Sequence, residues 1–292
     1  MHKDYKETKV DNIKVKPIIV SDSNSASKFK GSKIIPFEYY NMFICSKKRS
    51  GKTSLINTLI SKTTDKRTTL WCFVSTVNID PTWKQIVKNL QDKGYVVNTF
   101  ESLMDGKTNN LDIIIDELSK GSEDIEDLPT SKEEQKQKVD DLKSIRPSMN
   151  IFQVATEPLN KDGSKKKVYK PKYKVPENLF IFDDISTSLR NPSISRLLKI
   201  HRHMKASCII SSQYLHDLQP GSHLQLDMFI CFKSFSYEKL QYIHRVLDIS
   251  IPFDEFWSMY HQCVEEPYSF MYLNIRTEEV RCTFNKKIEY SL

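Results

Sequence analysis

Residues 46–53 read Ser46-Lys47-Lys48-Arg49-Ser50-Gly51-Lys52-Thr53 and lie between two predicted elements. The apolar run Met42-Phe43-Ile44-Cys45 before them is typical of a short buried strand, and the segment from Lys52 to Ser61 has helical periodicity. A glycine, a lysine and a threonine at this spacing, between a strand and a helix, match the pattern G-x-x-x-x-G-K-[ST]. The stretch therefore predicts a phosphate-binding loop, or P-loop.

Each part of this loop has a role in the chemistry that such loops support. Backbone amides of residues 46–53 and of the following helix would surround phosphate oxygens, so the whole stretch is the expected nucleotide-binding segment. Lys52 would reach the β- and γ-phosphates, and the hydroxyl of Thr53 would bind Mg²⁺. Gly51 would let the backbone approach the phosphates closely.

The first glycine of the pattern is missing, because Ser46 stands in its place. A bare Gly-Lys-Ser/Thr triplet arises by chance in about one chain in ten of this length. On the loop alone, a polar turn that simply precedes a helix remains the alternative.

A second motif lies far along the chain, where the apolar run Leu179-Phe180-Ile181-Phe182 leads into Asp183-Asp184. Such an uninterrupted run indicates a central strand of a parallel sheet. Ligands of open α/β sheets bind at the carboxyl ends of the strands, so both carboxylates are expected near the P-loop. Asp183 would hold Mg²⁺ through water, and Asp184 would polarise the attacking water. The alternative is that the pair only opens a surface loop, capping toward Ser186.

Gln213 follows the next predicted buried strand, Cys208-Ile209-Ile210, after two serines. At the end of a strand beside the Asp183 strand, its amide could reach the γ-phosphate or the attacking water. The alternative is a loop glutamine that is only solvated.

Strands and helices alternate over most of the remaining chain. Further strands are predicted at 70–74, 95–97, 228–232, 270–273 and 280–284, and further helices at 81–93, 111–118, 192–204, 237–247 and 254–263. This alternation predicts an α/β fold, with a mostly parallel sheet flanked by helices on both faces and a terminal hairpin.

Two segments lack this regularity. Residues 1–36 are rich in Lys, Ser and Asp and are expected to form a flexible basic arm, with one short strand at 18–20. Residues 119–177 combine an acidic cluster with seven lysines between 161 and 174, which predicts a charged, partly disordered insertion with a short helix near 133–142. Residues 37–292 would then form one domain interrupted by that insertion.

Composition bears on the compartment and on cysteine chemistry. No apolar run approaches the ~20 residues that cross a bilayer, and the polar N-terminus lacks the apolar core of a secretory signal. These features predict a protein of a cytosol-like compartment. Four of the six cysteines lie in apolar runs, and Cys263 and Cys282 are isolated, so neither a zinc site nor a disulfide is expected.

The P-loop, the acidic pair and the segment from His201-Arg202-His203 to Gln213 together resemble the FtsK–HerA superfamily of DNA-pumping ATPases. Within it, the motifs are most similar to those of the genome-packaging ATPases of large nucleocytoplasmic DNA viruses, the poxvirus-type branch. The resemblance covers about residues 38–285. It implies a P-loop NTPase fold of the ASCE/RecA-like class that uses ATP and Mg²⁺.

The same resemblance implies partners and a location. The chain would form a homo-oligomeric ring, act on double-stranded DNA and meet a capsid or portal protein, in the host cytoplasm (the viral factory) and in the virion. An arginine of one subunit would reach the ATP of its neighbour, and Arg202 is the candidate, against an exposed helix arginine or a DNA-backbone contact as alternatives. His201 and His203 have no carboxylate or cysteine at ligand spacing, so no metal beyond Mg²⁺ is expected. Asp184 stands where many relatives carry Glu, one methylene longer, which would slow hydrolysis.

The leading hypothesis is ATP-driven packaging of double-stranded DNA, with a small-substrate P-loop enzyme and a nucleotide-binding scaffold as alternatives. A GTPase would carry an Asn-Lys-x-Asp motif, which Asn160-Lys161-Asp162-Gly163 does not supply, and a nucleoside kinase would carry an arginine-rich lid. The lysines at 161–174 fit either contacts to DNA phosphates or ordinary solubilising charge. The net charge of +7 permits an anionic partner.

Overall fold

The computed structural model describes residues 29–123, 173–233 and 235–290. Most of the predicted arm, including its strand at 18–20, and most of the predicted insertion, including its helix near 133–142, lie outside these residues. The end of the arm is described, and there Ile35 is buried in the core while Lys30 donates backbone and side-chain hydrogen bonds to Lys174 and Ser61.

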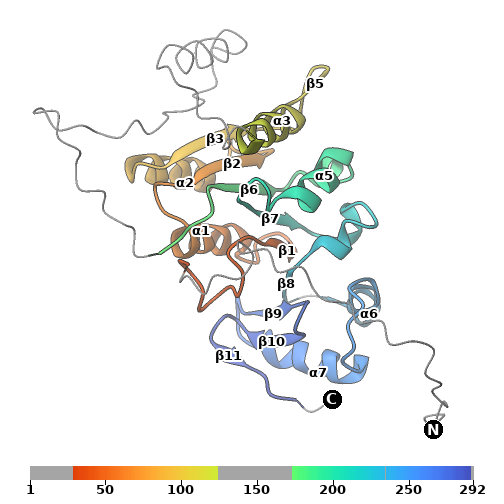
Figure 1. The fold of residues 1–292 in the computed structure, drawn as a ribbon. Coiled ribbons are helices and arrows are strands. Elements are labelled where there is room, and N and C mark those ends of the chain that lie inside the picture. Colours follow the sequence, from red (N-terminus) through yellow and green to blue (C-terminus); the bar gives the residue numbers. More distant parts are fainter. Residues whose placement is uncertain (1–28, 124–172, 234, 291–292) are drawn as a thin grey trace, which may run out of the picture.

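Among the described residues, nine strands form one sheet in the order β11-β10-β9-β8-β1-β7-β6-β2-β3 (Figure 1). The strands of this sheet are β1 Asn41–Cys45, β2 Thr69–Val74, β3 Val96–Phe100, β6 Asn178–Asp183, β7 Ala206–Ser212, β8 Met228–Phe232, β9 Phe270–Asn274, β10 Glu279–Cys282 and β11 Lys286–Lys287. From β3 to β8 all neighbours are parallel, whereas β8, β9, β10 and β11 pair antiparallel in succession. A separate small hairpin joins β4 Met104–Asp105 to β5 Thr108–Asn109.

Helices cover both faces of the sheet. They are α1 Lys52–Thr63, α2 Pro81–Asp92, α3 Asn110–Glu123, α5 Pro192–Ile200, α6 Tyr237–Val246 and α7 Phe253–Cys263, with short 3-10 turns η1 Ser186–Ser188, η2 Leu215–Asp217 and η3 His223–Gln225. Side chains of α1 and α2 form one apolar cluster against one face, and side chains of α3, α5, α6 and α7 form a second cluster against the other. Successive residues of a strand point to opposite faces, so Phe43 belongs to one cluster and Ile44 to the other.

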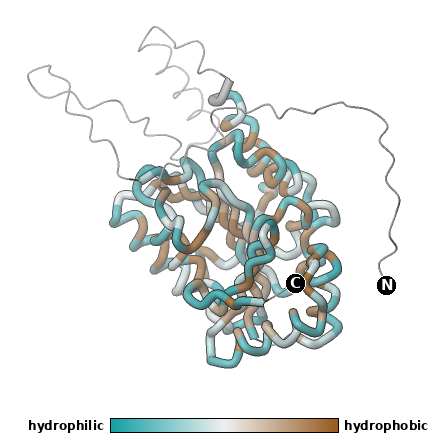
Figure 2. The backbone as a smooth tube through the Cα atoms, turned by 60° about the horizontal axis from the view of Figure 1, so that its bottom comes forward, coloured by the Kyte–Doolittle hydropathy of each residue, from teal (hydrophilic) through white to brown (hydrophobic). Residues whose placement is uncertain are grey.

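The apolar runs of the central strands lie inside these two layers. Figure 2 shows the hydrophobic segments gathered in the interior of the tube and the hydrophilic ones mostly at its periphery. All residues of β1, β6, β7 and β8 are buried. Continuous burial of this kind is typical of parallel strands with helices on both faces. No helix in the described part of the chain is long and apolar enough to span a membrane.

The predicted fold class is confirmed: the sheet is mostly parallel and flanked by helices. In space one strand, β7, separates β1, which leads into the predicted P-loop, from β6, which leads into the acidic pair. Element bounds differ at several ends. The helix predicted to reach residue 204 stops at Ile200, because turns at 201–205, closing on Lys205 with φ of 48°, lead into β7. In contrast, α3 continues to Glu123, beyond its predicted end at 118.

The prediction that the chain holds no disulfide is wrong. The structure joins Cys263, the last residue of α7, to Cys282, the last residue of β10, with their Cα atoms 4.3 Å apart. Packing of α7 on the terminal hairpin creates this proximity, which a separation of 19 residues without a local motif does not reveal. The remaining four cysteines are free and buried, as expected.

Candidate active site

The predicted P-loop, residues 46–53, connects the end of β1 to the start of α1. Ser46 is buried, and its backbone N–H donates to Ser212 O at 3.0 Å, which ties the start of the loop to the end of β7. Lys47, Lys48 and Arg49 are exposed, and the loop is closed by a bond from Ser50 Oγ to Lys47 O of 2.8 Å. The serine that replaces the first glycine is therefore accommodated inside the fold, where its hydroxyl has no hydrogen-bond partner among the described residues.

Gly51 is the N-cap of α1. It precedes the first helical residue with φ of 95° and ψ of 9°, a left-handed conformation that glycine adopts readily. The backbone conformation thus favours glycine at position 51, in addition to the expected close approach of a ligand. Amides at the start of α1 remain open to anionic ligands, since no side chain caps this helix.

Lys52 meets both carboxylates of the distant acidic pair. It is the first residue of α1 and is only 6% exposed. Its Nζ donates a hydrogen bond to Asp184 Oδ1 and lies 3.5 Å from Asp183 Oδ1. Three of the residues that the sequence placed in one site are thus brought together at the carboxyl edge of the sheet.

Asp183 ends β6 and is 2% exposed. Trp83 Nε1 on α2 donates to its Oδ2 at 2.9 Å, whereas its Oδ1 accepts no hydrogen bond in the part of the chain that the structure describes. Burial raises the pKa of this carboxyl, and the nearby Lys52 ammonium opposes that rise. A buried carboxylate oxygen that accepts no hydrogen bond and lies 3.5 Å from the Lys52 ammonium is chemically suited to a cation that phosphates also hold.

Mg²⁺ is the cation that the motifs imply. No cluster of three or more His, Cys, Asp or Glu side chains that could hold a metal ion occurs among the described residues. Magnesium in nucleotide sites is usually bound by one or two carboxylates together with substrate phosphates, so Oδ1 of Asp183, which accepts no hydrogen bond, and the hydroxyl of Thr53 fit such a site. Thr53 is the second residue of α1, directly after Lys52.

Asp184 has an unusual backbone conformation. Its φ is 55°, and its carbonyl oxygen accepts a 2.8 Å hydrogen bond from Ser75 Oγ at the end of β2. Asp enters the left-handed region more readily than Glu, so the conformation explains why the shorter acid is compatible with this position. Strained residues of this kind concentrate at functional sites.

Trp83 is the site residue that the sequence did not reveal. It is fully buried in α2, 100 residues from its carboxylate partner. A tryptophan on the apolar face of a helix is ordinarily interpreted as a core residue, and the Trp83 ring does pack in the hydrophobic core. Only the contact between α2 and the end of β6 shows that its N–H also orients Asp183.

Gln213 lies at the predicted edge. It directly follows β7, which pairs with β6 in register so that Asp183 is opposite Ser211. Its carbonyl oxygen accepts a 2.6 Å hydrogen bond from Lys239 Nζ, and this ammonium also lies 4.0 Å from the centre of the Tyr214 ring. The expected role of the Gln213 side chain stays a prediction.

Arg202 lies at the opposite edge of the sheet. It occupies the turn before β7, so it is at the amino ends of the parallel strands, whereas Lys52 follows the carboxyl end of β1. Its side chain is 51% exposed and lies 3.6 Å from the buried carboxylate of Asp227, which also forms an ion pair with Arg276. Within one chain the structure does not bring Arg202 to the other candidate residues.

His201 beside it is a core residue. It is 3% exposed, and its Nδ1 lies 2.9 Å from Leu198 O and 3.2 Å from Asn41 Nδ2. Burial lowers the pKa of His201 to about 4. The imidazole is therefore neutral near pH 7.

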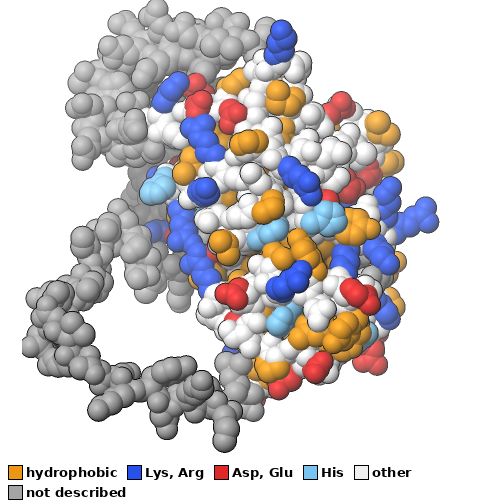
Figure 3. All heavy atoms as spheres, turned by 90° about the vertical axis from the view of Figure 1, so that its right-hand side faces the viewer, with side chains coloured by type: hydrophobic (Ala, Val, Ile, Leu, Met, Phe, Trp, Pro, Cys, Tyr) orange, Lys and Arg blue, Asp and Glu red, His pale blue; other side chains and the backbone are white. Residues whose placement is uncertain are grey.

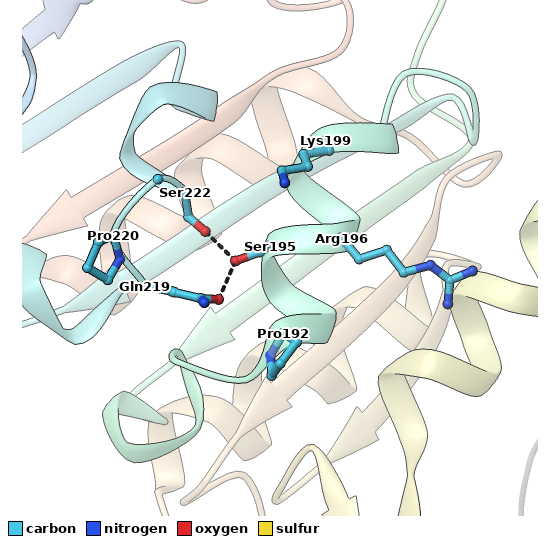
Figure 4. Close-up of a pocket in the computed structure, with 8 residues that line it drawn as sticks. Pro192, Ser195, Arg196, Lys199, Gln219, Pro220 and Ser222 are labelled. Atoms are coloured by element: carbon cyan, nitrogen blue, oxygen red, sulfur yellow. Dashed lines mark hydrogen bonds between the residues drawn. The ribbon is translucent and has the colours of Figure 1, made fainter.

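Two cavities differ in their relation to these residues. One of about 230 Å³ adjoins the P-loop and is lined by Lys47, Lys48, Arg49, Ser50, Phe232, Lys233, Pro267, Tyr268 and Ser269. The other, of about 450 Å³, lies between α5 and the loop at 219–222 (Figure 4). There Ser195 Oγ bonds to Gln219 and Ser222, and Arg196 points away toward α3, where it pairs with Asp116 at 2.7 Å. The larger cavity shares no residue with the P-loop or the acidic pair, so size does not identify the active site.

Comparisons with known proteins return structures and no sequence relatives. No protein-family model and no curated protein matches the chain. The fold is similar to that of the genome packaging NTPase B204 from Sulfolobus turreted icosahedral virus 2 in complex with AMP, with 16% identity over 88% of this chain and 100% of that one, and a TM-score of 0.44. It is also similar to B204, the DNA-packaging ATPase from Sulfolobus Turreted Icosahedral Virus (16% identity, 84% and 97% covered, TM-score 0.45). The cytoplasmic domain of the type VII secretion ATPase EccC from Thermomonospora curvata follows with 13% identity, 80% and 24% covered and a TM-score of 0.36.

Proposed function

We propose that this chain is the ATP-hydrolysing subunit of a motor that moves double-stranded DNA into a viral capsid. The observation that carries the ATPase part is the meeting of Lys52 with Asp183 and Asp184, which lie 131 and 132 positions further along the chain. A P-loop lysine beside two carboxylates at the carboxyl ends of parallel strands is an arrangement that supports nucleotide hydrolysis in P-loop NTPases.

Each residue of the proposed site has a separate role in nucleotide binding or hydrolysis. Amides of residues 46–53 hold the phosphates, and the Lys52 ammonium pairs with the terminal phosphate. An incoming phosphate competes with Asp184 for this ammonium, and Asp184 is then free to orient water and to accept its proton. Asp183 and Thr53 would hold Mg²⁺, which supplies neutralisation of the charge that develops on the phosphate oxygens.

The DNA part of the proposal is supported by the resemblance of the three motifs to packaging ATPases and by the net charge of +7. Figure 3 shows basic side chains on the face that carries α5 and α6, together with acidic and hydrophobic ones. The P-loop adds exposed lysines at the carboxyl edge of the sheet. The lysine-rich stretch at 161–174, most of which lies outside the described residues, is the second candidate contact. Contacts of this kind are independent of sequence and weaken with salt.

We further propose that the chain works as a ring and that Arg202 acts on the nucleotide of a neighbouring subunit. Its exposed side chain, remote from the site of its own chain, is compatible with that role. In mixed rings, Arg202→Ala subunits would stop hydrolysis at neighbouring sites while still binding nucleotide. If Arg202→Ala homo-oligomers keep wild-type turnover, Arg202 serves only its ion pair with Asp227.

The test of the function is ATP turnover with and without long duplex DNA, combined with imaging of the protein in the presence of both. We expect turnover to rise with duplex DNA, the rise to fade with salt, and rings to appear. Hydrolysis that DNA leaves unchanged would instead indicate a small-substrate enzyme, and binding without hydrolysis would indicate a scaffold.

A further inference from the structure

The turn between α7 and β9 holds Tyr268 in a backbone conformation that is unfavourable for tyrosine. Residues 266–269 are closed by hydrogen bonds from Ser269 to Glu266 O, of 3.2 Å from the backbone N–H and 2.6 Å from Oγ. Pro267 takes the second position and Tyr268 the third, where φ is 62°. A proline followed by a positive φ is the pattern of a type II turn, whose third residue is ordinarily Gly or Asn. A tyrosine at this place costs stability, and such residues persist mainly where they serve a function.

The side chain of Tyr268 gains little from the fold in return. It is 74% exposed, although large apolar rings usually bury most of their surface. Its ring lies against the start of α1: a Cβ placed on Gly51 would be 3.4 Å from Tyr268 Cδ1. The exposed ring is therefore held directly beside the P-loop.

This ring also lines the cavity that adjoins the P-loop. The cavity of about 230 Å³ is bounded on one side by residues 47–50 and on the other by the ends of β8 and the 267–269 turn. Sites that enclose whole small ligands span ~300–1,000 Å³, so this space fits only a part of a nucleotide. Four basic side chains line it as well, namely Lys47, Lys48, Arg49 and Lys233.

The strand order indicates which part of the nucleotide would occupy this cavity. The acidic pair lies on the β6 side of β1, where Lys52 contacts it. The cavity lies on the β8 side of β1, across the loop. If the terminal phosphate is at Lys52 and Asp184, the remainder of the molecule extends across the loop toward β8 and the turn that precedes β9.

We propose that Tyr268 is the platform on which the base of the bound nucleotide stacks. Every nucleobase has an aromatic face, and stacking on a tyrosine ring needs no hydrogen-bond partner. The adjacent basic side chains suit the ribose and the first phosphate. This inference rests on the proposed nucleotide site and adds to it the residue that holds the base.

The test compares binding of ATP with binding of inorganic tripolyphosphate, which has no base. Tyr268→Asn removes the ring and places a residue that tolerates a positive φ. We expect ATP to bind about tenfold more weakly, tripolyphosphate to bind as in the wild type, and the melting temperature to stay or rise. Tyr268→Phe keeps the ring and should retain wild-type affinity. Asp248→Asn, at another exposed position with φ of 51°, is the matched control and should change neither ligand.

Three other outcomes of these binding measurements would contradict either the stacking role of Tyr268 or the proposed nucleotide site. Wild-type affinity for ATP in Tyr268→Asn overturns the inference and leaves the proposed function intact. Equal weakening of ATP and tripolyphosphate also overturns it, because the ring then acts on the loop through Gly51 and not on a base. If the wild-type protein binds neither ligand, the proposed function itself fails.

Discussion

Lys52 Nζ donates a hydrogen bond to Asp184 Oδ1 although 132 positions separate the two residues. The contact exists because α1 starts at the carboxyl end of β1 and Asp184 follows the carboxyl end of β6, with β7 between the two strands. A nearly buried ammonium is thus shared by Asp184 and the buried Asp183. Removing one member of such a group leaves the others without charge compensation, so each substitution has a distinct consequence.

Asp184→Asn should separate binding from hydrolysis. Asn has almost the same shape and tolerates a positive φ, so the backbone at φ of 55° is preserved. The amide cannot accept a proton from water, and we expect turnover to fall at least ~100-fold. ATP affinity should be kept or increased, because Lys52 loses a competing partner. Wild-type turnover in this variant, measured beside calorimetric binding, would remove Asp184 from the catalytic set.

Trp83→Phe should weaken the hold on Asp183. The substitution keeps an aromatic ring in the core and removes the N–H that Asp183 Oδ2 accepts. We expect the free energy of unfolding to fall by about 1–3 kcal/mol and the Mg²⁺ concentration for half-maximal turnover to rise about tenfold. Trp257→Phe, on α7 and remote from Asp183, is the control. A Trp83→Phe protein with an unchanged Mg²⁺ requirement would limit Trp83 to packing.

Acid should destabilise the protein through His201. Its pKa is about 4 in the folded chain and about 6.5 when unfolded, so the unfolded chain binds more protons between these values. Stability therefore falls as pH drops from 6.5 toward 4, by about 2–3 kcal/mol from this residue. The free energy of unfolding of His201→Gln should fall less steeply over the same window. Other groups titrate in both proteins, so equal slopes would contradict the assignment.

Reduction should destabilise the C-terminal part of the sheet. The Cys263–Cys282 disulfide links residues 19 positions apart in the sequence, and its loss should lower the free energy of unfolding by about 3 kcal/mol. The Cys263→Ser, Cys282→Ser double variant should melt at the temperature of the reduced wild type, with or without reductant. A wild-type melting temperature that reductant does not change would show that the pair is not bonded in solution.

The sequence was most informative about elements and about the edge of the sheet where the site lies. Apolar runs and helix-start signals such as Asn191-Pro192 depend on local chemistry, so the longer elements were found with small errors at their ends. The two-residue strands β4, β5 and β11 were not predicted. Carboxyl ends of parallel strands meet at one edge, which is why the meeting of Lys52 with Asp183 and Asp184 could be predicted from the sequence.

Contacts that depend on how separate elements pack against one another could not be predicted from the sequence. The sequence pattern indicates only that Trp83 is a core residue. Its hydrogen bond to Asp183 depends on the packing of α2 against the end of β6. The disulfide depends on how α7 packs against the terminal hairpin. The contact of Tyr268 with Gly51 depends on the antiparallel addition of β9 to β8, which the alternation of strands and helices does not specify.

The most direct test of the ATP site is steady-state ATP turnover by Lys52→Ala, measured beside Lys62→Ala. Lys62 lies on the exposed side of the same helix, in its last turn, so its loss controls for the removal of a positive charge from α1. We predict that Lys62→Ala keeps wild-type turnover and that Lys52→Ala loses at least ~100-fold, because the phosphate loses its charged partner. Full ATP turnover in a folded Lys52→Ala protein would contradict the assignment of this loop and its acidic pair as the active site.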